Sequence, residues 1–262
     1  MDKVELSTQE KYFADIRKFL LFLREKTIGE ITTHDIQQWI AGLRSTKGER
    51  LDRKTVNRKV SAIINYFDWL TSLAVIAGNP TATLMNTRTQ SPLPDYLYEG
   101  EITTLYREAS QDPRTYLLVL LFLETGMKSH ELFALTKAHV DLSDPYQPEL
   151  WIKHTGKDTR KDRKVALPPN FIEVYNRYVA QYQIEDALFP YTDRFIQLLF
   201  AELKKRTRIA KELTPKTLRH THVVRAYSRG EDPDRIFDRI GLAPDSRKEA
   251  DEMYRRLARR GI

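Results

Sequence analysis

The segment ETGMKSHELFAL, residues 124–135, follows the unbroken apolar run YLLVLLFL of residues 116–123 and decides how this part of the chain folds. The apolar run predicts a buried helix, and Thr125-Gly126 interrupts its pattern. A second helix is expected to start near Lys128, with Glu131 three residues later. Helix N-termini favour anionic side chains. A lysine at this position is therefore either incidental or directed at an anion.

Composition limits the classes of function. The chain has 262 residues, 41% hydrophobic and 10% aromatic, so its size and content allow a large core. Its net charge of +7 is compatible with a polyanionic partner and equally with an ordinary globular protein. Without cysteine it has no disulfide, thiolate metal site or cysteine nucleophile. The six histidines show no metal-binding spacing, so no metal is expected.

Segments for targeting or membrane insertion are not visible in the sequence. The first residues, MDKVELSTQE, lack the pattern of a secretory signal peptide. The longest apolar run has eight residues, whereas a membrane-spanning helix needs about 20. We therefore expect a cytoplasmic protein that does not bind membranes.

The first part of the chain reads as helical. Ser7 and Glu10 resemble a capping box, and apolar residues follow at helical spacing. Further helices are expected over 33–43 and 52–70, with a short one over 81–86. We therefore predict that residues 1–84 form a compact unit of four helices without strands.

Residues 85–97, MNTRTQSPLPDYL, contain two prolines and no periodicity, and this predicts a linker. Residues 98–262 would form a second domain that is mainly helical. Its strands, ELWIKH at 149–154 and RKVALP at 163–168, predict a β-hairpin. Its helices are expected at 99–110, 113–124, 128–137, 170–182, 193–211, 215–229, 232–241 and 246–259. The fold class is thus mainly α with a small antiparallel β-hairpin or sheet.

Two basic clusters could contact DNA. The first lies within two turns of one predicted helix and comprises Arg53, Lys54, Arg58 and Lys59. A solvated helix face and a face against phosphates explain it equally well. The second lies at the tip of the hairpin and comprises Lys157, Arg160, Lys161, Arg163 and Lys164. Such a turn either reaches a DNA groove or is a solvated charged loop.

Two later stretches contain candidate catalytic residues. In TPKTLRHTHVVRAY, residues 214–227, Thr214 can cap a helix whose first turns present Lys216, Arg219 and His220. This combination suits an anion site, although a surface basic cluster would look the same. In DEMYRRL, residues 251–257, Tyr254 lies between acidic and basic residues. A tyrosine can attack a phosphodiester when cations stabilise the reaction, but one of 13 tyrosines indicates little by itself.

The order of these elements is more specific than any one of them. The chain contains TGMKSHEL, a hairpin lysine, PKTLRHT, IGL and a late tyrosine. This order resembles the tyrosine recombinase and integrase family, which includes Xer-type recombinases, phage integrases and Cre. The resemblance implies that residues 1–84 are a four-helix, SAM-like core-binding domain, and that residues 98–262 are the tyrosine recombinase catalytic domain.

The resemblance also implies an activity and its residues. Family members bind duplex DNA and cleave it by attack of a tyrosine, which leaves a 3′-phosphotyrosyl link, without metal or nucleotide cofactor. By this resemblance Tyr254 is the nucleophile, Arg219 the second phosphate-binding arginine and Lys157 the general acid. Lys128 and Lys216 occupy the positions of the first arginine and of a histidine. Glu131 and His220 are supporting residues.

Several departures from the family pattern keep two hypotheses open. Lysine replaces arginine at 128, and Leu242 stands where the family has histidine. The interval from Leu242 to Tyr254 is about three residues longer than usual, and the tail after Tyr254 is short, which speaks against a cyclic tetramer while leaving self-association on DNA open. We favour an enzyme, a site-specific recombinase with weakened activity. The alternative is an impaired relative that binds DNA without strand exchange. An RNA-binding or protein-binding helical protein would require the motif order to be chance.

Overall fold

The structure is a computed structural model that describes residues 6–24, 26–45, 48–84, 93–153 and 162–261. The chain divides into two compact units, residues 1–91 and 92–262. Each unit has its own hydrophobic core. We describe the two units separately.

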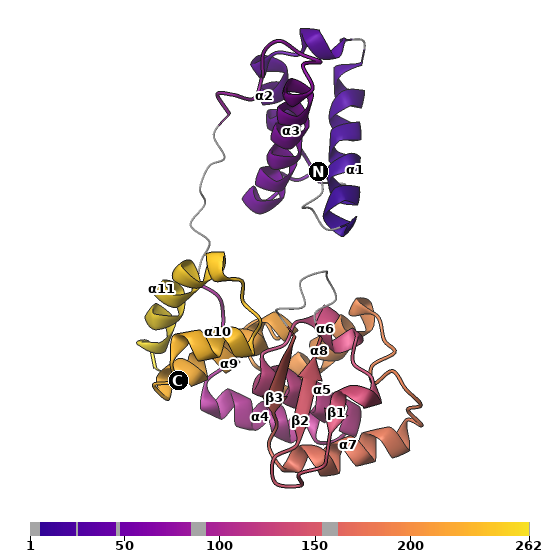
Figure 1. The fold of residues 1–262 in the computed structure, drawn as a ribbon, viewed down its shortest axis with the longest axis vertical. Coiled ribbons are helices and arrows are strands. Elements are labelled where there is room, and N and C mark those ends of the chain that lie inside the picture. Colours follow the sequence, from indigo (N-terminus) through magenta and orange to yellow (C-terminus); the bar gives the residue numbers. More distant parts are fainter. Residues whose placement is uncertain (1–5, 25, 46–47, 85–92, 154–161, 262) are drawn as a thin grey trace. The chain divides into compact units, whose positions relative to one another are not determined.

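The first unit is built from helices α1 (Leu6–Leu23), α2 (Thr33–Gly42) and α3 (Arg53–Ser72), with the short 3-10 helix η1 (Ile28–Glu30) before α2 (Figure 1). Its core centres on Phe19, whose ring lies edge-on to Trp39 and Phe67 with centroids 5.2 and 6.2 Å apart. These contacts follow from the helical spacing of apolar residues in α1, α2 and α3. The short helix expected over 81–86 is not formed in the described residues 81–84, where Ala82 and Leu84 close hydrogen-bonded turns instead.

The second unit contains most of the helices. In chain order, their bounds are α4 (Glu99–Ala109), α5 (Pro113–Thr125), α6 (Ser129–Phe133), η2 (Lys137–His139), α7 (Asn170–Gln181), α8 (Asp193–Thr207), α9 (Pro215–Ser228), α10 (Pro233–Arg239), η4 (Pro244–Ser246) and α11 (Arg247–Ala258). Three short strands, β1 (Val140–Asp141), β2 (Glu149–Ile152) and β3 (Arg163–Ala166), form an antiparallel sheet in the order β1-β2-β3. The predicted fold class, mainly α with a small antiparallel sheet, is confirmed.

Helix α5 is the centre of this unit. The Asp112 side chain accepts a hydrogen bond from the amide of Thr115 at 3.1 Å, and Pro113 suits the first turn. All residues from Leu117 to Leu123 are buried, because α4, α7 and α9 pack around the helix. The apolar run of the sequence therefore forms a helix that is covered on all sides, as its lack of a polar face predicts.

The sheet and α6 differ in part from the sequence expectations. The hairpin pairing of β2 with β3 is as predicted, with Leu150 opposite Val165. The additional strand β1 pairs with β2 and was not predicted. Helix α6 ends at Phe133 and not near 137, because the chain turns so that the Leu135 carbonyl accepts from the amide of Leu188 at 2.9 Å. A partner more than 50 residues away thus overrides the local helical pattern.

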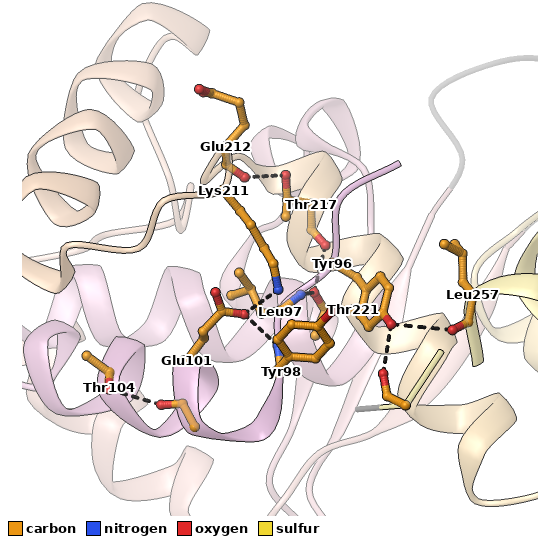
Figure 2. Close-up of polar contacts among 12 residues, drawn as sticks. Tyr96, Leu97, Tyr98, Glu101, Thr104, Lys211, Glu212, Thr217, Thr221 and Leu257 are labelled. Carbon is orange, nitrogen blue, oxygen red and sulfur yellow. Dashed lines mark hydrogen bonds and ion pairs between the residues drawn. The ribbon is translucent and has the colours of Figure 1, made fainter. Parts of the chain in front are cut away.

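A second cluster of buried apolar residues joins α9, α10 and α11, which lie together in Figure 1. The segment before α4 forms hydrogen bonds with α9 and with the end of α11 (Figure 2). The Tyr96 hydroxyl donates to the Gly261 carbonyl at 2.7 Å, just after α11, and the Leu97 amide donates to the Thr221 hydroxyl of α9 at 2.9 Å. Tyr96 and Leu97 were assigned to the linker, yet both are buried here. This segment helps to fix α9 and α11, the two helices that carry the candidate site.

Candidate active site

Arg219 links three segments of the second unit. It lies in α9, which Thr214 caps by accepting from the amide of Thr217 at 3.1 Å. Its guanidinium donates through Nη1 to the Gly126 carbonyl and through Nη2 to the Ile240 carbonyl, the latter at 2.9 Å. Of its five N–H groups these contacts use two, so three have no protein acceptor among the described residues. A partly buried cation with unused donors is suited to bind an oxyanion.

Each of the two loops whose carbonyls accept hydrogen bonds from Arg219 contains a glycine with positive φ. Gly126 ends α5 at φ +61°, and a Cβ there would lie 2.8 Å from Cδ2 of His222. Gly241 follows Ile240 at φ +62°, and a Cβ there would lie 2.9 Å from Nη1 of Arg163. Positive φ is unfavourable for residues with a Cβ. Glycine at 126 therefore avoids a clash with His222, and glycine at 241 lets the chain lie close to the Arg163 guanidinium.

Glu131 binds Arg163, which the sequence groups with the basic residues of the hairpin. Its Oε1 and Oε2 accept from Nη1 and Nη2 of Arg163, both at 2.9 Å, while Nε of Arg163 donates to the Arg239 carbonyl at 2.6 Å. Burial raises the pKa of Glu131, but the hydrogen bonds and charge of Arg163 outweigh this effect and hold the pKa below its usual value. The Lys128 amide also donates to Oε2 of Glu131, at 2.8 Å. The sequence does contain a signal for the burial of Arg163. Side chains alternate between the two faces of β3, and Arg163 lies on the same face as buried Val165.

Tyr254 of α11 lies beside His220 of α9. The phenolic oxygen is 2.7 Å from Nδ1 of His220, and the ring stacks on Tyr227 with centroids 5.9 Å apart. The tyrosine is only 4% exposed. Burial raises the pKa of Tyr254 to about 12, although the positive charge of Arg219 acts in the opposite direction. Burial, with the charges of Lys216 and Arg219, lowers the pKa of His220 to about 4.

The remaining predicted site residues take different positions. Lys216 lies one turn before His220 and is exposed, and Lys128 is half-buried at the start of α6. Leu242 packs against the apolar cluster that contains Tyr254. Lys157, Arg160 and Lys161 of the hairpin turn lie outside the described residues. The structure thus brings Arg219, His220 and Tyr254 together, with Glu131 and Arg163 acting electrostatically on Arg219.

The basic cluster of α3 divides into two pairs. Arg58 and Lys59 both form ion pairs with Asp15 of α1, and Lys59 is buried. Neither a solvated face nor a phosphate-binding face describes Lys59, because an acid on another helix neutralises it. The DNA-binding role of Lys59 stays a prediction, and its burial against Asp15 speaks against it. Arg53 and Lys54 are exposed in the first turn of α3.

The described residues limit two other classes of function. No three of their histidine, cysteine, aspartate or glutamate side chains come close enough together to bind a metal ion. None of the helices in the described ranges is both long and apolar enough to span a membrane.

Comparison with known proteins agrees with this architecture. Residues 95–249 match the phage integrase family, and residues 4–73 match the SAM-like domain found at the N-terminus of phage integrases. This chain belongs to the phage integrase family. The match to the integrase catalytic region ends before Tyr254, so it contains Lys128, Glu131 and Arg219 but not the candidate nucleophile.

Individual relatives are similar over most of their length. A tyrosine recombinase of Thermosipho africanus is 28% identical over 84% of this chain and 80% of its own. The tyrosine recombinase XerC of Staphylococcus haemolyticus is 28% identical over 89% of this chain and 82% of its own. Among solved structures, the XerH site-specific recombinase in a post-cleavage complex with palindromic difH substrate has a TM-score of 0.76 at 16% identity, covering 97% of this integrase chain and 76% of XerH. At this identity the similarity shows a shared fold.

Proposed function

We propose that this phage integrase family member is a site-specific DNA recombinase that cleaves and rejoins duplex DNA through a 3′-phosphotyrosine at Tyr254. The observation that carries the proposal is the position of Arg219, a partly buried arginine with unused donors, near Tyr254, whose hydroxyl contacts the adjacent residue His220. A cation beside a phenol can stabilise both the phenolate and the phosphorane that forms when the phenolate attacks phosphorus.

The proposed reaction is a transesterification without net loss of a phosphoester bond. The phenolic oxygen of Tyr254 attacks the scissile phosphorus, and the bond from phosphorus to the 5′-oxygen breaks. Arg219, Lys128 and Lys216 bind the non-bridging oxygens, and Lys157 protonates the leaving 5′-oxygen. The buried pair of Glu131 and Arg163 keeps the loops around Arg219 in place. Reversal of these steps with a different 5′-hydroxyl rejoins the strands.

Duplex DNA is the proposed partner of both units. The exposed side chains Arg53 and Lys54 at the start of α3 can contact backbone phosphates. The similar fold of a recombinase bound to its DNA substrate supports this assignment. The chemistry proposed for Tyr254 and Arg219 requires neither a metal ion nor a nucleotide.

A DNA-binding relative without strand exchange is the second candidate. Burial of Tyr254 and the elevation of its pKa to about 12 favour it, since a buried neutral phenol is a poor nucleophile. Lysine at 128 also lacks the planar fork with which arginine binds two phosphate oxygens. If each missing transition-state contact costs about 2.7–4 kcal/mol, cleavage slows by roughly a hundredfold to a thousandfold for each.

Covalent trapping separates the two candidates. A pool of nicked duplexes with randomised sequence at the scissile phosphate is incubated with the protein and resolved on a denaturing gel. The nick lets the cleaved end diffuse away, so the covalent adduct accumulates. A slowly migrating protein–DNA band that is absent with Tyr254→Phe supports the recombinase. Gel shifts of pool members without any such band support the binding protein.

A further inference from the structure

We propose that His220 is the proton acceptor for Tyr254: Nδ1 takes the phenolic proton as the oxygen attacks phosphorus and returns it when the strands rejoin. This inference rests on the proposed function, because it assigns a catalytic role within the same reaction. The family resemblance implies only a supporting role for His220, not that of proton acceptor.

The contact between the two side chains has the geometry that proton transfer needs. The phenolic oxygen lies 2.7 Å from Nδ1, within the range of about 2.6–3.2 Å expected for a general base. The two residues come from α9 and α11, whose packing fixes their rings 5.7 Å apart. Among the described residues, His220 is the only hydrogen-bond partner of the Tyr254 hydroxyl.

The direction of this hydrogen bond follows from the number of buried polar groups that it leaves unpaired. Nε2 of His220 is buried and has no partner in the described part of the chain. If Nδ1 carried the proton and donated to Tyr254, the phenolic hydrogen and the Nε2 lone pair would both be unpaired. If Nε2 carries the proton, the phenol donates to Nδ1 and only the Nε2 N–H is unpaired. Because each buried unpaired polar group is costly, the second tautomer is favoured and leaves Nδ1 as an acceptor.

Burial and the charges around His220 keep the imidazole neutral before substrate binds, so Nδ1 is unprotonated in the favoured tautomer. Lys216 and Arg219 face it from its own helix and, with burial, keep the imidazole neutral at pH 7, while Tyr254 faces it from α11. A phosphate bound by these two cations would neutralise them and place negative charge near the ring. An opposite charge favours the protonated form, so the basicity of His220 increases when substrate binds.

The protons and bonds balance in this step. The O–H bond of Tyr254 breaks, its oxygen bonds to phosphorus, and the proton forms an N–H bond at Nδ1 of His220. The phosphorus–5′-oxygen bond breaks, and the 5′-oxygen receives a different proton from the general acid. On rejoining, Nδ1 returns its proton to the departing phenolate.

The tautomer can be measured in the full-length protein without DNA. Long-range ¹H–¹⁵N correlation spectra at pH 7 should show His220 as the Nε2–H tautomer with an unprotonated, hydrogen-bonded Nδ1. Its Nδ1 signal should shift in Tyr254→Phe, which removes the donor. An Nδ1–H tautomer, or a signal unaffected by Tyr254→Phe, would overturn the inference.

The catalytic role is tested with His220→Asn, since the asparagine side chain can place an acceptor near the Nδ1 position but cannot take up a proton. The matched control is His139→Asn, because Nδ1 of His139 accepts from the Thr136 amide at 3.0 Å, outside the site. With the nicked duplex pool, His220→Asn should slow adduct formation by roughly 10²–10⁴-fold, as for loss of a general base. His139→Asn should match wild type, and DNA binding by gel shift should be equal for all three proteins.

A modified substrate distinguishes the base from the acid. A pool with sulfur in place of the bridging 5′-oxygen has a leaving group that needs no proton. His220→Asn should remain slow on this pool, whereas Lys157→Ala should regain most of its rate. If the sulfur pool restored the rate of His220→Asn, or if this variant matched wild type on the oxygen pool, this inference alone would be overturned. Failure of wild type to form an adduct on either pool would overturn the proposed function itself.

Discussion

Glu131 and Arg163 form a buried ion pair with two hydrogen bonds of 2.9 Å each, although 32 residues separate them in the chain. The pair connects the start of α6 to β3 and, through the Arg239 carbonyl, to the end of α10. The carbonyls of Gly126, just before α6, and Ile240, just after α10, accept hydrogen bonds from Arg219. The arrangement of Arg219, the proposed phosphate-binding arginine, thus depends on a second arginine that need not touch DNA.

Glu131→Gln should destabilise the second unit by about 3–5 kcal/mol at pH 7, because it leaves Arg163 buried without its counter-charge. The folded pKa of Glu131 lies below its ordinary value of 4.5, so the contribution is complete above that pH and disappears as pH falls through the folded pKa. The difference between wild type and variant should therefore shrink below pH 4.5. Urea-dependent hydrogen exchange of the α5 amides measures it for this unit alone.

The control for this variant is Glu173→Gln in α7, whose exposed carboxylate lies 3.9 Å from Arg177. Such a pair contributes little, so the change should stay within about 0.5 kcal/mol. Equal effects of the two substitutions, or a difference that grows as the pH falls below 4.5, would contradict the role assigned to the buried pair.

Gly126→Ala should lower the melting temperature of the second unit by several degrees. The substitution places a Cβ at φ +61° and within 2.8 Å of the His222 ring, and we expect a cost of about 2 kcal/mol or more. Gly100→Ala in α4 is the matched control, because nothing lies within 4 Å of its Cβ position. It should stabilise the unit by about 0.5–1 kcal/mol. Calorimetry of both variants checks the prediction, and a Gly126→Ala melting point at or above that of wild type would refute it.

Lys128→Arg should accelerate adduct formation if residue 128 contacts the scissile phosphate, since a guanidinium can bind two oxygens where an ammonium binds as a point charge. The measurement is the single-turnover rate of covalent trapping on the nicked pool. A rate equal to or below that of wild type would show that residue 128 is away from the phosphate or that the site has adapted to lysine.

Arg53→Ala should weaken DNA binding and lower the salt dependence of the association constant by about one unit of log–log slope, as expected for one lost phosphate contact. Lys59→Met should leave that slope unchanged, because Lys59 is buried against Asp15. Fluorescence anisotropy over a range of salt concentrations compares the two variants. A reduced slope for Lys59→Met would show that Lys59 contacts DNA.

The local patterns of the sequence predicted most helices and the hairpin, because amphipathic periodicity and capping residues act within a few positions. The resemblance also indicated Arg219, His220 and Tyr254, which the structure brings together. The roles of all three residues remain predictions, and the family match ends at residue 249, before Tyr254.

Long-range contacts were beyond the reach of those patterns. Helix α6 is shorter than its sequence suggests because Leu135 pairs with Leu188, and Lys59 is buried because its partner lies on another helix. The two-residue strand β1 exists only through its pairing with β2. Arg163 appeared to be one cation of a charged turn, yet its side chain is 8% exposed and bound to Glu131. In each case the deciding partner is distant in sequence.

The central claim is that Tyr254 becomes covalently joined to DNA, and the most direct measurement is the mass of the attached peptide. After trapping with wild-type protein and exhaustive nuclease digestion, trypsin should release EADEMYR, residues 249–255, whose one tyrosine is Tyr254. The account predicts that this peptide carries a single nucleotide through a 3′-phosphate. A nucleotide attached to any other tyrosine peptide would contradict it. An unmodified EADEMYR peptide recovered from the covalent band itself would also contradict it.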